Sequence, residues 1–372
     1  MIDEKTPDQS VEQKTPVETV PVQTPAPAEP PAVATTSAST TETPTKRVVK
    51  KSFLDKIKFD SWKAWIYLLP ALILLAIFTV WPIINTVRVA FLEDYNSLGA
   101  VGGETYKFGF GNFVTVFTTN LPKYSEGGNF RTALTNTLLI CIITVPLSTL
   151  LALLIAVALN SIKPLQKVYQ TIFFLPYVTN TLAIGMVFAA VFDVVGDFYR
   201  PDLVESWGFI NNIIKAFGGK PVNWIDGLGK SSYWPKLFVL IIYIVWNALP
   251  FKILILLGGL QSVNKQYYEA AMIDSTPRWR VFTRITVPLL SPMLAYVIIT
   301  GFIGGFKEYS SIIGIFGDQM ADGQLFTMVG YIYAALPDAA YGEASAAALI
   351  LFLIIFAVTM VNLYVSKKTT HY

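Results

Sequence analysis

Residues 237–257 read LFVLIIYIVWNALPFKILILL, and residues 287–306 read VPLLSPMLAYVIITGFIGGF. Each stretch is about 20 residues long, which is the length of an α-helix that crosses the hydrocarbon core of a bilayer. Lys252 is the one charged residue in the two stretches. Both stretches are therefore predicted to be membrane-spanning helices.

The rest of the chain holds further apolar runs of this kind, at residues 65–84, 134–159, 169–192 and 344–365. The sequence therefore predicts an all-α integral membrane protein with six transmembrane helices. Several prolines lie inside or at the ends of the six runs. Membrane bundles tolerate them where neighbouring groups compensate for the lost hydrogen bond, which favours kinked helices around a cavity. These prolines are Pro70, Pro82, Pro146, Pro176 and Pro250.

The composition agrees with a membrane protein and excludes several other classes. Charged residues make up 14% of the chain, whereas soluble domains have about 25%. The net charge of +3 gives no indication of a nucleic-acid partner. With one cysteine (Cys141) and one histidine (His371), the chain has no disulfide framework and lacks the usual residues of a zinc site or a Ser-His-Asp triad. We therefore predict no metal and no cofactor.

The chain divides into three parts by composition. Residues 1–45 are rich in Pro and Thr, and we expect a disordered cytoplasmic tail because they cannot bury enough apolar surface. Residues 46–64 form a basic juxtamembrane segment, and residues 65–372 form the membrane domain. The short loops predicted to lie on the same side of the membrane as the N-terminus are basic and carry few acidic residues. The positive-inside rule therefore predicts that both termini are cytoplasmic. The expected location is a plasma membrane.

The loop between the two quoted runs reads QSVNKQYYEAAMIDSTPRWRVFTRIT over residues 261–286. Residues 264–273 are predicted to form a short helix with Tyr268, Ala271 and Met272 on one side. Residues 274–276 should end that helix. Thr276 and Pro277 then form a suitable N-cap and first-turn pair for a second helix.

The first of these short helices has the properties of a docking element. Ala270 and Ala271 are small enough to permit close approach to another surface, and Glu269 offers a charge for a basic partner. An amphipathic helix lying on the bilayer surface explains the same residues equally well. The residues alone do not decide between the two.

The order Glu269-Ala270-Ala271, then Asp274, resembles the EAA loop of ABC importer permeases, and in particular the carbohydrate-uptake permeases of the maltose and glycerol-3-phosphate type. In that family the loop is a coupling helix that docks in a cleft of the cytoplasmic ATPase. The resemblance extends from Trp65 to the C-terminus, with a core unit at about 131–365. Further matching positions are Phe282, Ile285, Pro288, Trp246, Pro250, Gly259, Leu260, Gln261, Asn136, Thr137, Leu175 and Pro176.

The resemblance implies a type I importer fold and a multi-pass transporter subunit of the bacterial plasma membrane that is not an enzyme. The implied partners are a second permease in a heterodimer, a cytoplasmic ATPase dimer, an extracytoplasmic solute-binding protein and membrane lipid. The chain resembles the first permease of the pair, because it lacks the Gly-rich C-terminal tail common in the second. The implied coupling residues are Glu269, Ala270, Ala271, Asp274, Ser275 and Thr276. The residues matching the solute path are Asn247, Phe251, Gly301, Gly305 and Glu308.

Some residues depart from the family pattern. Ser275 stands where the family usually has Gly, which permits a left-handed turn. We expect Ser275 to adopt another turn with the help of Thr276 and Pro277, or to accept strain. The segment Gly317-Asp318-Gln319 replaces the usual Gly-Gly-Pro. These changes leave the solute open among sugars, polyols and glycerol phosphates.

Two charges lie within or near the predicted spans. Lys252 is expected to snorkel to the inner interface, and Glu308 either faces the path or is exposed at the outer interface. Asn247 either faces the solute path or packs against a neighbouring helix.

The outer loop 196–234 is predicted to carry a short helix at 209–217 that contacts the binding protein or packs on the permease's own outer face. Gly229-Lys230-Ser231 is similar to part of a P-loop, but Trp224 stands where the motif requires its first Gly. The energy for transport should therefore come from a partner. An ion-gradient transporter would call for inverted repeats, and a membrane enzyme for converging titratable groups; neither is visible in the sequence.

Overall fold

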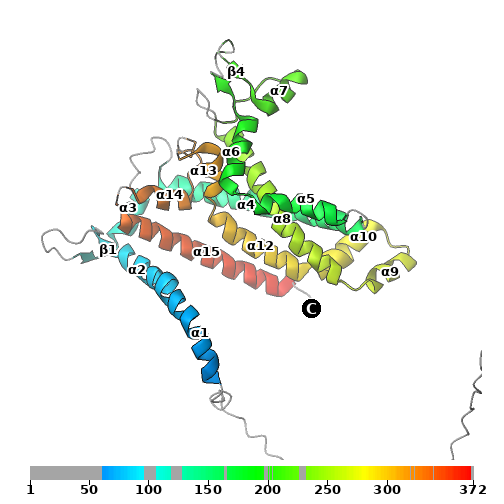
Figure 1. Cartoon of the computed structure of the whole chain (residues 1–372), viewed down its shortest axis with the longest axis horizontal. Coiled ribbons are helices and arrows are strands. Elements are labelled where there is room, and N and C mark those ends of the chain that lie inside the picture. The colour runs from blue at the N-terminus through cyan, green and yellow to red at the C-terminus, as the bar shows by residue number, and fades with distance from the viewer. Residues whose placement is uncertain are drawn as a thin grey trace, which may run out of the picture. The chain divides into compact units, whose positions relative to one another are not determined.

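Helices make up most of the chain that the structure describes (Figure 1). The computed structural model describes residues 61–95, 106–118, 128–162, 166–196, 200, 202, 204–225, 232–318, 320–321, 323–337 and 339–369. The described residues from Ile66 onward form one compact unit. The predicted tail 1–45 and most of the basic segment 46–64 lie outside the described residues.

Four helices are continuous, long and apolar enough to cross a membrane. The first is built from α1 and α2 with one turn of π-helix between them, and the other three are α4, α8 and α15. Their bounds are Ser61–Leu75 for α1, Ala76–Val80 for the π-turn, Trp81–Ala90 for α2, Phe130–Ser161 for α4, Tyr233–Ser262 for α8 and Tyr341–Thr369 for α15. Four of the six predicted spans are therefore confirmed as single helices.

The third predicted span, 169–192, is wrong as a single helix. It consists of α5 (Gln166–Val178) and α6 (Thr181–Phe192), which meet at an angle of 99°. Asn180 begins α6, because its side-chain oxygen accepts hydrogen bonds from the N–H groups of Leu182 at 2.9 Å and Ala183 at 3.4 Å. Such an N-cap starts a new helix in a new direction.

The fifth predicted span, 287–306, is also bent. A segment made of α10 (Arg278–Val281), a π-turn (Phe282–Thr286) and α11 (Val287–Leu289) meets α12 (Ser291–Phe306) at 69°. Pro292 lies in the first turn of α12, where its missing N–H costs no helical bond. Counting each bent pair once gives six spans, so the all-α, six-helix prediction is confirmed at the level of fold class.

Two short helices after α12 were not predicted. They are α13 (Ser310–Phe316) and α14 (Met328–Ala335), and both are too short to cross a membrane. Asn136 and Thr137 of α4 hold the chain between them. The Asn136 amide donates to the carbonyls of Gln324 at 2.9 Å and Phe326 at 2.8 Å, and the Thr137 hydroxyl accepts from the Met328 N–H at 3.0 Å.

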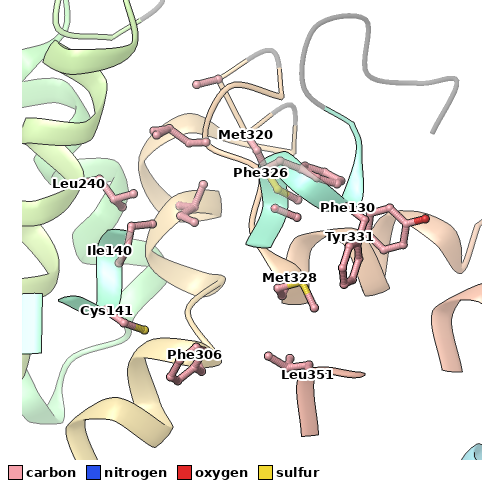
Figure 2. Packing of buried hydrophobic residues seen from close by; sticks show 14 of the residues in the cluster. Phe130, Ile140, Cys141, Leu240, Phe306, Met320, Phe326, Met328, Tyr331 and Leu351 are labelled. Atoms are coloured by element: carbon pink, nitrogen blue, oxygen red, sulfur yellow. The ribbon is translucent and has the colours of Figure 1, made fainter. Parts of the chain in front are cut away.

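Helices α4 and α8 form the centre of the bundle, α5 and α12 pack against them, and α15 packs against α12, α2 and α14. A large apolar cluster surrounds the N-terminal halves of α4 and α8 (Figure 2). There the rings of Phe130 and Tyr331 pack edge to face with their centroids 5.8 Å apart. A second cluster near the other end of the bundle joins α4, α8 and α12, and its buried residues are Ala152, Leu153, Ala156, Leu159, Ile253, Leu256, Leu257, Leu260, Leu290 and Val297.

Small residues let these helices approach closely, as is usual in membrane bundles. At the crossing of α6 and α13, a Cβ added at Gly185 would lie 2.8 Å from the backbone of Gly314. No side chain fits between the two backbones, so glycine is required for this contact.

Helix α9 (Gln266–Ile273) lies in the loop that follows α8. Two other loops each contain a two-stranded ladder and a short helix. One holds the ladder of β1 (Leu92–Glu93) and β2 (Lys107–Phe108), followed by α3 (Gly111–Thr118). The other holds the ladder of β3 (Val195–Gly196) and β4 (Val204–Ser206), followed by α7 (Gly208–Ala216). Helix α7 confirms the short helix predicted at 209–217 to within one residue.

Candidate functional site

A cavity of about 470 Å³ lies between α4, α8 and α12, and reaches the breaks that separate α5 from α6 and α12 from α13. The structure brings all five residues predicted for the solute path to its wall: Asn247, Phe251, Gly301, Gly305 and Glu308. They come from α8, from the end of α12 and, for Glu308, from the residues just after α12, and the loop containing α9 separates the first of these from the other two along the chain. The break between α5 and α6, which the sequence did not reveal, adds Tyr177 and Thr181 to the wall.

The wall combines polar groups with aromatic faces. The Asn247 amide donates to the Tyr243 hydroxyl at 3.4 Å, and that hydroxyl donates to the Thr181 carbonyl at 2.6 Å. Asn247 therefore bonds to its own helix and lines the cavity. Phe251 stacks on Tyr177 with ring centroids 6.1 Å apart and an interplanar angle of 17°.

Glu308 lies just beyond the end of α12, where its half-buried side chain faces the cavity. Its Oε1 accepts a hydrogen bond from the Ser311 N–H at 3.1 Å, which satisfies a free donor in the first turn of α13. Its backbone carbonyl accepts from the Thr327 hydroxyl at 3.0 Å. Glu308 thus orders the chain between α12 and α14 while presenting a carboxyl group to the cavity.

Lys252 does not snorkel, and that prediction is wrong. The side chain is only 4% exposed, and its ammonium group donates to three oxygens of α4: the Val145 carbonyl at 3.2 Å, Ser148 Oγ at 2.7 Å and Thr149 Oγ1 at 2.9 Å. Because an ammonium group has three donors, these bonds satisfy it inside the bundle and it has no need to reach water. Lys252 links α8 to α4 at the wall of the cavity.

The two path glycines have a packing reason. A Cβ at Gly301 would lie 3.1 Å from Val145 Cγ1 and 3.3 Å from Lys252 Nζ, and one at Gly305 would lie 2.9 Å from Cys141 Sγ. Both glycines let α12 approach α4, so their place in the wall follows from helix packing. Among the described residues, no group of three His, Cys, Asp or Glu side chains is arranged to hold a metal ion.

The loop after α8 contains the second candidate site. Helix α9 has an exposed surface that includes Glu269 and Ala270. Ala271 is buried, and the hydroxyl oxygen of Tyr268 lies 3.4 Å from that of Thr286. Ala271 and Tyr268 therefore face the rest of the permease. Met272 was predicted to share their side, but it is 71% exposed. The exposed surface of α9 also carries Tyr267 and Ile273.

The end of α9 forms a Schellman motif around Ser275. The Thr276 N–H bonds to the Ala271 carbonyl at 2.9 Å, and the Ser275 N–H to the Met272 carbonyl at 3.0 Å. Ser275 has φ 52°, so it takes the left-handed conformation expected of Gly and accepts the strain.

Thr276 is not the N-cap that was predicted. Helix α10 begins one residue later, with Pro277 at the cap position and no side-chain capping bond. The first bonds of α10 run from the N–H groups of Arg280 and Val281 to the Pro277 carbonyl, at 2.9 and 3.1 Å, while the Thr276 N–H closes the Schellman motif of α9.

Comparison with known proteins identifies the chain. Residues 131–371 match the profile of the family described as binding-protein-dependent transport system inner membrane component. The chain belongs to this family of permeases. Membership makes the chain a transporter subunit in a membrane, and it confirms the importer prediction over the ion-gradient transporter and the membrane enzyme.

Relatives of this permease include carbohydrate transporters. The lactose transport system permease protein of Rhizobium radiobacter is 29% identical over 252 residues, which cover 67% of this chain and 74% of that protein. The arabinooligosaccharides transport system permease protein of Bacillus subtilis is 29% identical over 320 residues, covering 83% and 90%. The resemblance to carbohydrate-uptake permeases is therefore confirmed.

Solved structures show the same fold. The permease matches a chain in a bacterial ABC transporter involved in the import of the acidic polysaccharide alginate, with a TM-score of 0.67 and 22% identity, covering 84% of this chain and 97% of that one. A second structure of the alginate transporter, in complex with an alginate pentasaccharide-bound periplasmic protein, gives a TM-score of 0.68 at 22% identity and covers 84% of this chain and 96% of that one. The fold prediction of an ABC importer permease is confirmed.

Proposed function

We propose that this permease is the first of two permease subunits in an ABC importer for a carbohydrate or a related polar solute, and that the cavity is its part of the solute path. The observation that carries the proposal is the wall of the cavity, where Asn247 and Phe251 of α8 converge with Glu308, which lies just after α12. Amide and carboxyl groups hydrogen-bond hydroxyls, and an aromatic ring provides an apolar face for a sugar ring. The named lactose and arabinooligosaccharide relatives support this solute class.

Uptake by reconstituted vesicles tests the solute path. Asn247→Ala and Phe251→Ala should each lower uptake of the cognate sugar about tenfold, because a lost contact of about 1.4 kcal/mol corresponds to that factor. Asn362→Ala is the matched control, since Asn362 lines a separate hollow between α12 and α15. Normal uptake by both cavity variants would contradict the proposed path.

The proposal assigns α9 to a separate cytoplasmic ATPase dimer. Its exposed surface offers one carboxylate, Glu269, beside the apolar side chains of Tyr267 and Met272, which suits a cleft with a basic rim. The coupling residues are Glu269, Ala270, Ala271, Asp274, Ser275 and Thr276. Ala271 and the Schellman turn hold the helix in place, and Glu269 with Ala270 makes the contact. A helix lying on the bilayer surface is the competing interpretation.

The orientation follows from the same assignment. If α9 meets a cytoplasmic ATPase, the C-terminal end of α15 is cytoplasmic as well, since Figure 1 shows it toward the α9 end of the bundle. An even number of spans places residues 1–64 on that side too, as a tail and a basic flank next to the membrane domain 65–372 and its core unit 131–365. The opposite end of the bundle then receives the extracytoplasmic binding protein.

Helix α7 is proposed as one contact of that binding protein. Asn211 fixes the helix, because its side chain bonds both the carbonyl and the N–H of Val222, at 2.8 and 2.9 Å, and accepts from the Trp224 indole at 3.1 Å. Phe209, Ile213 and Phe217 follow one another at intervals of one helical turn and are 63%, 40% and 89% exposed. This exposed stripe favours contact with a partner over packing on the permease's own surface.

A further inference from the structure

Four large apolar side chains form an exposed patch on the loop between α2 and α4. They are Phe108 on β2, Phe110 in the turn that follows, and Val114 and Phe117 on α3, and they are 76%, 66%, 60% and 65% exposed. Phe110, Val114 and Phe117 recur at intervals of four and three residues, which places them on one helical face. Soluble surfaces rarely expose such a cluster, so it marks an interaction site.

The opposite side of α3 is fixed to the end of the first span. The Asn112 amide donates to the carbonyls of Ala90, the last residue of α2, at 3.1 Å and of Leu92 at 2.9 Å. The Gly111 N–H donates to Glu93 Oε1 at 2.7 Å. These bonds hold the start of α3 beside the last turn of a membrane helix, and therefore at the depth where that helix leaves the hydrocarbon core.

The same small unit touches the beginnings of two other spans. Val116 is fully buried, Phe117 packs edge-on against Phe130 at the start of α4 with centroids 4.8 Å apart, and a Cβ at Gly342 near the start of α15 would lie 2.6 Å from Asn112 Nδ2. Figure 1 shows β1 and α3 at the end of the bundle where α2 ends and α15 begins. Three spans thus end at the level of the patch.

The surface of α2 next to the patch is apolar and exposed, as a surface in contact with lipid would be. Ile83, Ile84 and Val87 on the last turns of α2 are 59%, 55% and 39% exposed. Exposed Arg88 and Lys107 flank this band, as cations do at a headgroup layer. Tyr95 and Tyr106 pack together at the hairpin with ring centroids 5.2 Å apart, and tyrosine is enriched at membrane interfaces.

We propose that Phe108, Phe110, Val114 and Phe117 form an interfacial anchor, a patch that inserts into the lipid headgroup and upper acyl-chain region of the leaflet opposite α9. The anchor fixes the depth of the ends of α2, α4 and α15 in the bilayer. Its partner is the lipid interface itself, recognised through apolar and aromatic burial rather than through a specific headgroup. It does not depend on which solute the permease carries.

Spin labelling tests the anchor, because Cys141 is the chain's one cysteine and is buried. In a Cys141→Ala background, Phe117→Cys is labelled with a nitroxide. The control is Phe217→Cys at the C-terminal end of α7, another exposed phenylalanine. The full chain, in the complex in which it purifies, is placed in nanodiscs of phosphatidylcholine and phosphatidylglycerol. Collisions with oxygen, which concentrates in lipid, are compared with collisions with the water-soluble Ni–EDDA complex.

The anchor predicts that oxygen collisions exceed Ni–EDDA collisions at position 117 and that the order reverses at position 217. A Phe110→Cys label should behave like the label at 117, which guards against a local effect of one substitution. Three results would overturn the proposal. Dominant Ni–EDDA collisions would place the patch in water, and shielding from both reagents would place it under another subunit. Shielding only after addition of the purified binding protein would make it a binding-protein surface.

Discussion

Ser275 is a single residue whose left-handed conformation is expected to strain the end of α9. A side chain at φ 52° closes the Schellman motif of α9, and non-glycine residues in the left-handed region cost about 1 kcal/mol or more. Ser275→Gly should therefore strengthen the turn by about 1 kcal/mol and slow hydrogen exchange of the Thr276 N–H about fivefold. Ser275→Ala is the control, since it keeps the Cβ and should give no such protection. Equal exchange in the Gly variant and the natural chain would show that the turn is not strained.

The residue scale also shows what the sequence leaves undecided. Ser275 could be identified as a departure from the family pattern, but the choice between another turn and strain depends on hydrogen bonds along α9. Lys252 was assigned to the interface because an isolated charge is costly in lipid. Only the structure shows that Val145, Ser148 and Thr149 provide three acceptors facing it from α4.

At the scale of elements, the contact between α6 and α13 depends on two glycines. Replacing Gly314 by Leu would force the two backbones apart, since a Cβ at Gly314 would lie 3.2 Å from Gly185 Cα and from the Leu182 carbonyl. Overpacking of this kind costs about 1–3 kcal/mol or more. Gly314→Leu should therefore lower the yield of monodisperse protein in size-exclusion chromatography. Gly258→Leu is the matched control, because an added Cβ there has no neighbour within 4 Å and should leave the yield unchanged. An unaffected Gly314→Leu variant would mean that the contact is dispensable.

The proposed binding-protein contact of α7 belongs to the same scale. Lys215 and Lys220 are exposed near the apolar stripe, and Lys215 lies over the Trp207 ring at 4.4 Å from its centroid. Replacing both by Glu should reverse the local charge and reduce capture of the loaded binding protein several-fold, as seen in uptake at limiting binding protein. Uptake at saturating binding protein should recover. Unchanged uptake under both conditions would count against contact at α7.

Helices could be predicted from the sequence where a long apolar run is enough to identify a membrane span. Residues 134–159 and 237–257 correspond to continuous helices α4 and α8. Composition does not reveal a change of direction, so the bends at Asn180 and Leu290 were missed. Helices α13 and α14 lack the length of a span, and their place depends on long-range bonds such as those from Asn136. The solute-path residues were found through the family resemblance, and their convergence at one cavity needed the fold.

At the scale of the whole molecule, the account requires α9 and the cavity to act together. The two lie on α8 and its continuation, separated along the chain by the last turns of that helix, where Gly259 lets α12 approach. A partner that pulls on α9 therefore acts on the same helix that presents Asn247 and Phe251 to the solute. An interaction at α9 can change the cavity only if the loop has two positions, one for each state of the ATPase.

Glu269→Lys tests this claim most directly. The variant replaces an exposed carboxylate at the proposed docking surface by a cation, and loss of a charge-assisted contact should weaken binding of the ATPase by about 1–3 kcal/mol. Thr283→Lys, which places the same cationic side chain in the loop outside α9, is the control. Co-purification of the ATPase and uptake by reconstituted vesicles are measured together. The account predicts that Glu269→Lys loses ATPase and uptake in parallel while the control keeps both. A full complement of ATPase with normal uptake in Glu269→Lys would contradict the docking role and favour a helix lying on the bilayer surface.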